Sequence, residues 1–153
     1  MHHGFMAPAE LTSHLGYWLR LVSNHVSQAF ARKLQLIDIT VAEWALMRVL
    51  FGTEDNPSQL AEHMGMTKGA ITKLADRLIA KSLVIKTANP EDGRSHTLRL
   101  SKKGEKLVPK LAAMADQNEA ECFSHLSEKD RIMLERVLKQ SVKHYGLTSI
   151  PIN

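Results

Sequence analysis

The first clear pattern along the chain is a stripe of apolar residues that recurs every three or four positions between residues 11 and 34. This spacing follows the 3.6-residue period of an α-helix, so it predicts one long amphipathic helix that ends before Ile37. Two similar stripes follow, and they predict a helix capped by Ser101 and a last helix capped by Ser127. Pro109 removes one backbone donor inside the former helix, so we expect a bend there. The apolar faces are Leu11, Leu15, Trp18, Leu19, Val22, Val26, Phe30 and Leu34, then Leu107, Leu111, Met114, Asn118 and Phe123, then Leu134, Val137, Leu138, Val142 and Tyr145.

A strong helix-start signal lies at residues 39–44. Thr40 and Glu43 have the spacing of a capping box, in which each side chain bonds one free amide of the first helical turn. Ile39 and Trp44 occupy the two positions of a hydrophobic staple around that cap. The sequence therefore predicts a helix from residue 41 to about residue 51, with Gly52 as its stop.

Two further helices are predicted on either side of a short turn. Asn56 can cap a helix whose first position is Pro57, and Gly65 ends that helix. Thr67 can cap the next one, which runs to about Lys81. Helix, glycine-containing turn and helix together are the organisation of a helix-turn-helix.

From residue 83 the period changes from helical to alternating. Residues 83–87 and 95–100 each alternate in side-chain character, and Asn89-Pro-Glu-Asp-Gly93 between them is typical of a turn. These two runs predict a β-hairpin. The chain is thus expected to be mainly α with a small β-hairpin wing, a winged helix-turn-helix with additional helices at both ends.

Composition adds one feature, an uneven distribution of charge. With 153 residues, 44% of them hydrophobic, the chain is long enough for one domain with a substantial core. Its net charge is +4, but residues 67–110 hold eleven Lys and Arg against four Asp and Glu, a net of +7 that leaves −3 for the remainder. A basic middle segment favours a localised surface for a polyanion. A lysine-rich face that is merely solvated is the alternative, and charge alone does not decide between them.

The predicted helix over residues 67–81 has two contrasting faces. At 100° per residue, one side gathers Ile71, Leu74, Ala75 and Leu78, and the opposite side presents Gly69 and Lys73 with Thr72, Asp76, Arg77 and Ala70 beside them. A glycine in a first turn costs about 0.5–1 kcal/mol, and Lys73 repels Arg77 four positions on by a few tenths. Duplex DNA explains both costs, because small residues allow close approach to the major groove and phosphates neutralise the cations. A solvated basic helix with a chance glycine is the weaker alternative.

The tip of the predicted hairpin carries Arg94 just beyond an Asp-Gly turn. A cation at this place is suited to a neighbouring minor groove, where negative potential is concentrated, and Asp92 can hold the guanidinium in a bidentate pair. An ordinary surface turn, in which Asp92 bonds only its own backbone, explains the same residues when they are taken alone.

These segments together resemble the MarR family of regulators. The resemblance rests on Leu60-Ala61-Glu62, Thr67 with Thr72-Lys73-Leu74 and Asp76-Arg77-Leu78, Leu83-Val84, Asp92-Gly93-Arg94-Ser95, and Leu98-Arg99-Leu100-Ser101 with Gly104. It covers about residues 10–147 and implies a DNA-binding winged helix at 56–101 between dimerisation helices at 10–36 and 102–147. Ser82 departs from the pattern, because the family usually has glycine between the recognition helix and the strand. The DNA-binding residues we expect are Thr67, Lys68, Gly69, Ala70, Thr72, Lys73, Arg77, Asp92, Arg94 and Ser95.

The resemblance also implies a partner and an effector. The apolar stripes of the first and last two helices would be buried in a homodimer, whose two recognition helices meet half-sites of a near-palindromic operator in double-stranded DNA. Family members are commonly repressors that small aromatic acids release from DNA. We expect an effector to contact large amphipathic side chains near the junction of the two parts, namely His14, Tyr17, Trp18 and Trp44, although these residues are equally explained as core.

Other classes of function find less support. The chain contains no Gly-x-Ser-x-Gly elbow, GxxxxGK loop or His-Glu-x-x-His motif, so we expect no enzyme, and we expect no cofactor. The pair Cys122-x-x-His125 would place a thiol and an imidazole on one helix face, but the chain lacks further ligands nearby, so we expect no metal. A redox-sensing role for Cys122 is the weaker alternative to a small buried hydrophobe in the dimer region. A single cysteine, no signal peptide and no apolar run long enough for a membrane span together favour a cytoplasmic protein. A sequence-indifferent architectural DNA binder remains the alternative to a regulator.

Overall fold

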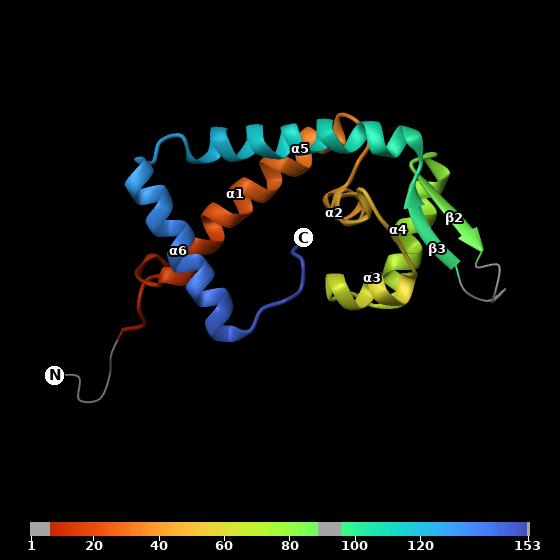
Figure 1. The fold of residues 1–153 in the computed structure, drawn as a ribbon. Coiled ribbons are helices and arrows are strands. Elements are labelled where there is room, and N and C mark those ends of the chain that lie inside the picture. Colours follow the sequence, from red (N-terminus) through yellow and green to blue (C-terminus); the bar gives the residue numbers. More distant parts are fainter. Residues whose placement is uncertain (1–6, 89–95, 153) are drawn as a thin grey trace.

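The computed structural model describes residues 7–88 and 96–152, which form six α-helices and a small three-stranded sheet. A 3₁₀ turn, η1 (Leu11–Ser13), precedes α1 (Leu15–Gln35), and α2 (Val41–Leu50) follows. Then come β1 (Glu54–Asp55), α3 (Pro57–Met64), α4 (Lys68–Ala80), β2 (Val84–Ala88) and β3 (His96–Leu100). The chain ends with the long α5 (Lys102–Phe123) and α6 (Glu128–Tyr145). Figure 1 shows α5 spanning the molecule, with α2–α4 and the sheet at one end and α6 at the other.

The predicted caps form because each is a local pairing of side chain and backbone. Thr40 Oγ1 accepts from the Glu43 amide at 3.1 Å, and Glu43 Oε1 accepts from the Thr40 amide at 2.8 Å, which completes the capping box. The Ser101 and Ser127 side chains cap α5 and α6 as expected. The helix α5 continues through Pro109 from Lys102 to Phe123.

The sheet has the order β1–β3–β2, and all of its pairings are antiparallel. The register Val84↔Leu100 and Lys86↔Leu98 confirms the hairpin pairing of the two predicted strands. A third strand that the sequence did not predict, β1, extends the sheet through Glu54↔Arg99 and Asp55↔Leu98. The turn predicted at residues 89–93 lies outside the described residues.

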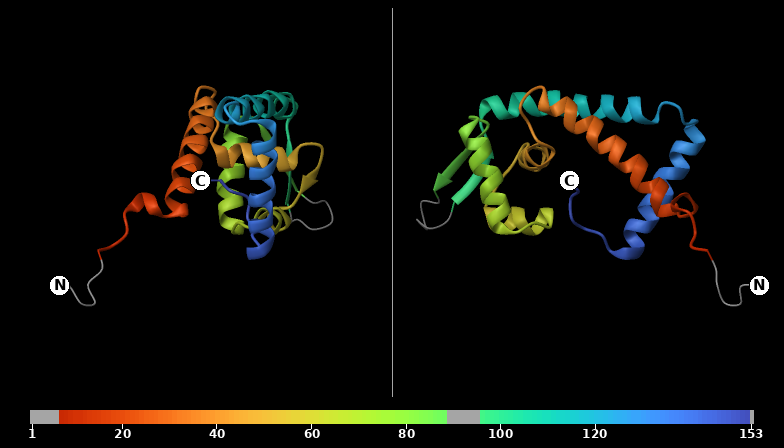
Figure 2. Two further views of the ribbon diagram at one scale, coloured as in Figure 1. Left: turned by 90° about the vertical axis from the view of Figure 1, so that its left-hand side faces the viewer. Right: turned by 180° about the vertical axis from the view of Figure 1, so that it is seen from behind.

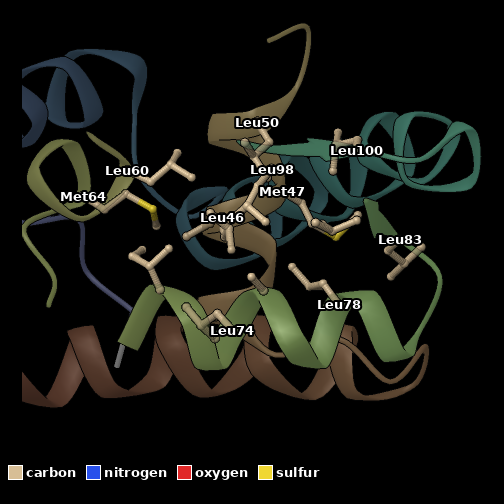
Figure 3. Packing of buried hydrophobic residues seen from close by; sticks show 14 of the residues in the cluster. Leu46, Met47, Leu50, Leu60, Met64, Leu74, Leu78, Leu83, Leu98 and Leu100 are labelled. Carbon is tan, nitrogen blue, oxygen red and sulfur yellow. The ribbon is translucent and has the colours of Figure 1, made fainter. Parts of the chain in front are cut away.

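The hydrophobic core lies between α2, α3, α4, the sheet and the first half of α5. In Figure 3, Leu46 and Met47 of α2 lie toward Leu74 and Leu78 of α4, and Leu50 lies beside Leu98 of β3. The inward side of α4 is therefore the predicted one: Ile71, Leu74, Ala75 and Leu78 are all buried. This core fixes the orientation of α4, and hence which of its residues face solvent.

The helices at the two ends of the chain leave their apolar stripes largely uncovered. Leu34 is the one fully buried residue of α1, and α6 has none. Leu15 is 83% exposed and Val137 is 47% exposed, although both belong to the predicted apolar faces. Leu11, which the sequence places in the first helix, lies in the separate turn η1 because His14 takes an extended conformation before α1 begins.

Candidate nucleic-acid interface

The helix-turn-helix is built from α3, the turn at Gly65 and α4. Asn56 Oδ1 accepts from the Gln59 amide at 2.8 Å and starts α3. Gly65 ends it with φ +67°, a left-handed conformation that favours glycine. Thr67 Oγ1 then accepts from the Ala70 amide at 3.1 Å and starts α4. The two helices follow each other closely, with the first turn of α4 exposed (Figure 2).

The outward face of α4 is small and basic at its N-terminal end. Lys68, Gly69, Thr72 and Lys73 are all exposed, and a Cβ added to Gly69 would meet nothing within 4 Å. Thr72 Oγ1 donates to the Lys68 carbonyl at 3.0 Å. Within residues 7–88 and 96–152, neither Lys68 nor Lys73 forms an ion pair, so both ammonium groups remain free to meet phosphates.

A polar hollow lies beside this face, between the start of α3, α4 and the sheet. Its volume is about 360 Å³. The start of α3, α4, β2 and β3 supply the polar groups that line it, which are Asn56, Ser58, Gln59, Lys68, Thr72, Asp76, Lys86 and His96. Its two lysines carry the same charge as the outward face of α4. Lys86 and His96 were not among the residues we expected at the interface. The sequence feature that could have identified them is their position on the two predicted wing strands, which lie next to α4.

Arg77 lies one turn beyond Lys73 on α4 and is exposed as well. It also lines a larger cavity, together with Arg48 of α2 and Asp38 of the α1–α2 loop. The sequence grouped Arg77 with Lys73 because the two lie four residues apart. The structure brings Thr67, Lys68, Gly69, Ala70, Thr72 and Lys73 together at the start of α4, and it places Arg77 near that helix's other end.

The wing residues Asp92, Arg94 and Ser95 lie outside the described residues, but the base of the wing is well defined. Ser101 Oγ donates to the Ser82 carbonyl at 2.7 Å and accepts from the Gly104 amide at 3.0 Å. The Ser101 amide donates to the Leu83 carbonyl at 3.0 Å. These bonds tie the end of α4, the start of β2 and the start of α5 into one rigid corner.

Ser82 has φ +62°, which is the left-handed conformation that a glycine would adopt freely. The departure from the usual glycine at this place therefore does not change how α4 ends: Lys81 caps the helix and the chain turns at Ser82. A non-glycine residue here stores strain of about 1 kcal/mol.

The larger cavity, of about 1090 Å³, lies at the junction between the helix-turn-helix and the long helices. Its wall is mostly apolar, with Val26, Phe30, Trp44 and Phe123 among its members. Its charged side chains are Arg48 and Arg77 together with Asp38, Asp116 and Glu119. Of the four residues expected near an effector, Trp44 lines this cavity. His14, Tyr17 and Trp18 lie at the far end of α1, where Trp18 Nε1 donates to the Thr12 carbonyl at 2.9 Å, so the four do not share one site within a chain.

A polar link joins α1 and α5 near this cavity. Asn118, which is 4% exposed, donates to the Val26 carbonyl at 3.2 Å and accepts from Lys33 Nζ at 3.0 Å. Lys33 also pairs with Glu121 at 2.8 Å. The hydrogen bond from Lys33 lowers the pKa of Glu121 below its ordinary value, and the opposite charge of Lys33 acts in the same direction.

Cys122 and His125 do not share a helix face. Cys122 lies in the last turn of α5, which ends at Phe123, and His125 lies in the link to α6. The expectation of one helical face for both is wrong because the helix stops between them. Over the described part of the chain, no three His, Cys, Asp or Glu side chains are grouped closely enough to hold a metal ion, and no helix is long and apolar enough to cross a membrane.

The arrangement of α3, the turn, α4 and the β2–β3 hairpin defines a winged helix-turn-helix protein. Comparison with known proteins agrees with this assignment. The model of the MarR family matches residues 37–95, a range that includes Asp92, Arg94 and Ser95. The chain belongs to the MarR family.

Relatives and solved structures extend the match over most of the chain. The chain is 32% identical to the HTH-type transcriptional regulator MhqR of Bacillus subtilis over 126 residues, which cover 79% of this chain and 81% of that protein. It is 27% identical to the HTH-type transcriptional repressor IacR of Pseudomonas putida, over 80% of this chain and 74% of that protein. A mutant of E. coli MarR, solved in complex with operator DNA, has the same fold with a TM-score of 0.73 at 23% identity, over 84% of this chain and 93% of that one.

Proposed function

We propose that this protein is a homodimeric, sequence-specific DNA-binding regulator of transcription, a repressor that a small aromatic acid releases from its operator. The observation that carries the proposal is the exposed start of α4, where Gly69 leaves room for a groove wall and Lys68 and Lys73 have no ion-pair partner among the described residues. The opposite side of α4 is buried in the hydrophobic core, and this packing holds the exposed face toward solvent. A regulator of this kind acts on chromosomal DNA, so we place the protein in the cytoplasm. We propose no enzymatic reaction for it.

Base contacts and phosphate contacts divide between the elements. Thr72 and Lys73 lie where an inserted helix meets base edges, and Thr67 and Lys68 lie at the helix start, where free amides and the positive end of the helix dipole favour phosphate. The wing, with Arg94 at its tip and Asp92 and Ser95 beside it, supplies a contact to the adjacent minor groove. Lys86 and His96 at the wing base extend the same surface.

Dimer formation follows from the uncovered stripes of α1 and α6. Leu15, Trp18, Leu19 and Val22 on α1 are each about half exposed or more. The outward apolar residues of α6 are between 38% and 72% exposed, with Val137 at 47% and Val142 at 45%. Apolar surface left uncovered on two long helices is typical of a subunit interface, and a two-fold axis would present two α4 helices to successive turns of DNA. We expect sedimentation equilibrium to give twice the 17.1 kDa chain mass.

The junction cavity is the site we assign to the effector. The apolar wall suits a flat aromatic ring, and Arg48 and Arg77 are the groups on it that can pair with a carboxylate. Asp38, Asp116 and Glu119 on the same wall oppose a second negative charge, so the effector we expect carries one carboxylate. Because Arg77 belongs to α4, an anion bound there acts directly on the helix that carries Lys73. Titration of the protein with salicylate as the probe, in a Trp18→Phe background that leaves Trp44 as the single indole, should quench or shift Trp44 emission; no response to this or related phenolic acids would count against the site.

Competition binding tests the regulator against the alternative of an architectural DNA binder. A labelled duplex from the promoter region beside the gene is displaced at fixed salt by the same unlabelled duplex or by random duplex of equal length. A regulator prefers its operator by about 10³-fold or more, whereas an architectural protein binds both alike. Equal competition by the two duplexes would overturn the proposal in favour of the alternative.

A further inference from the structure

The segment after α6 returns to the helix-turn-helix, although nothing in its apolar pattern predicted this. Gly146, with φ +62°, ends α6, and the chain then runs back between α6 and the α3–α4 turn (Figure 1). The view from behind in Figure 2 shows the same path. The segment thus joins two parts of the fold that α5 otherwise holds far apart.

One backbone hydrogen bond and one close approach fix the segment at the turn. The Ile150 amide donates to the Met64 carbonyl at 3.2 Å, a carbonyl in the last turn of α3. At Gly65, a Cβ would lie 2.8 Å from Ser149 Cα, which is too close for any side chain. Glycine is therefore required at position 65 for two reasons: it adopts the left-handed conformation that ends α3, and its lack of a side chain leaves room for Ser149.

Two side chains of the segment complete the apolar contact. Ile150 and Ile152 are half-buried against the core, whereas Pro151 between them is exposed. The proline favours an extended backbone at the residue before it, and in an extended chain alternate side chains share a side. The same three residues line the junction cavity, so the segment forms one of its walls.

We propose that residues 149–152 are a latch, which closes one wall of the junction cavity and holds the α3–α4 turn to the end of α6. A contact of one hydrogen bond and two half-buried side chains opens at low cost compared with the whole fold. An aromatic ligand that enters the cavity displaces the latch, and the turn before α4 is then released from the long helices. The regulatory meaning of this step rests on the proposed function, but the latch itself is a property of the free protein.

A matched pair of variants tests the latch without any DNA. Ile150→Asp places a charge on the packed side chain, and Thr148→Asp places the same charge two residues earlier on an exposed side chain. Both are made in the Trp18→Phe background, so that emission reports on Trp44 in the cavity wall. Circular dichroism and thermal unfolding confirm that each variant keeps the fold.

We expect Ile150→Asp to speed amide hydrogen exchange in residues 149–152 and 64–66 by about tenfold or more, because the charge favours the open state of the latch, from which these amides exchange. Acrylamide should quench Trp44 about twice as effectively in this variant, because one wall of its cavity is open. Thr148→Asp should match the parent in both measurements. Equal exchange and equal quenching in the two variants would overturn the latch and leave the DNA-binding proposal standing.

A second variant keeps the latch testable if Ile150→Asp does not fold. A chain that ends at Thr148 lacks the latch and gains no buried charge, so the same increases in exchange at 64–66 and in Trp44 quenching are expected. Parent-like values in this shortened chain would contradict the latch as directly as those of Ile150→Asp.

Discussion

Lys81 Nζ lies 3.0 Å from both carboxylate oxygens of Glu43, so the C-cap residue of α4 is tied to the first turn of α2. Glu43 is fully buried, and one of its oxygens also accepts from the Thr40 amide. Lys81 Nζ contacts the Asp38 carbonyl as well. A single ammonium group therefore fixes the end of the proposed recognition helix to the loop that follows α1.

Removal of this ammonium group should destabilise the protein. Lys81→Met leaves a buried carboxylate without its counter-charge, and since the Lys81 side chain is 28% exposed we expect a loss of about 2–3 kcal/mol in the free energy of unfolding. Urea denaturation measures it. Glu43→Gln combined with Lys81→Met should recover more than half of the loss, because glutamine keeps the cap without the charge; an unaltered loss in the double variant would show that the pair is not responsible.

Ser82→Gly should stabilise the protein. Its φ of +62° is strained for serine and free for glycine. The strain of about 1 kcal/mol, less the entropy cost of glycine, leaves an expected gain of up to about 0.5 kcal/mol. Ser82→Ala is the matched control, since alanine has the same strain and should give no gain. Thermal unfolding separates the two, and equal midpoints for the two variants would argue against strain at this turn.

Two glycines offer a test that separates folding from DNA binding. At Gly69 an added Cβ meets nothing, so Gly69→Ala should raise the stability of the free protein by about 0.5–1 kcal/mol and yet weaken operator binding, because the methyl group enters the space for the groove wall. At Gly104 a Cβ would collide with the Leu83 carbonyl, so Gly104→Ala should cost about 2 kcal/mol or more.

Both alanine variants are compared by urea denaturation and by operator affinity at fixed salt. Operator affinity that is unchanged in Gly69→Ala would mean that this part of α4 does not approach the DNA.

The Lys33–Glu121 pair predicts a pH dependence. The lowered pKa of Glu121 means that its ionised form is favoured in the folded state, so the stabilisation is present above the pKa of the unfolded chain and is lost as the pH falls through the folded-state value. The unfolding midpoints of the parent and Glu121→Gln should differ at pH 7 and converge in acid. A difference that persists at low pH would assign the effect to packing instead of charge.

The sequence predicted best what depends on near neighbours. The caps at Thr40, Asn56, Thr67, Ser101 and Ser127 each need one side chain and an amide three residues on, and all five form. The buried face of α4 follows equally from its period.

Features that depend on distant residues were missed. The strand β1 exists only because two residues pair with β3, more than forty positions later. That Arg77 also lines the junction cavity depends on how α1 and α2 pack around it. The latch is a third case, since Ile150 and Ile152 form too short a pattern to predict any contact. Their partner, the turn at Gly65, lies 85 residues earlier.

The most direct test of the account is the operator affinity of Lys73→Ala beside that of Lys129→Ala, measured by fluorescence anisotropy over a series of salt concentrations. Both variants lose one exposed positive charge, but Lys73 lies on the outward face of α4 and Lys129 lies at the start of α6. The account predicts that Lys73→Ala weakens operator binding about tenfold or more across the salt series, because the variant loses a base contact, whereas Lys129→Ala stays near the parent. Equal affinities for the two variants would contradict the assignment of α4 as the DNA-reading helix.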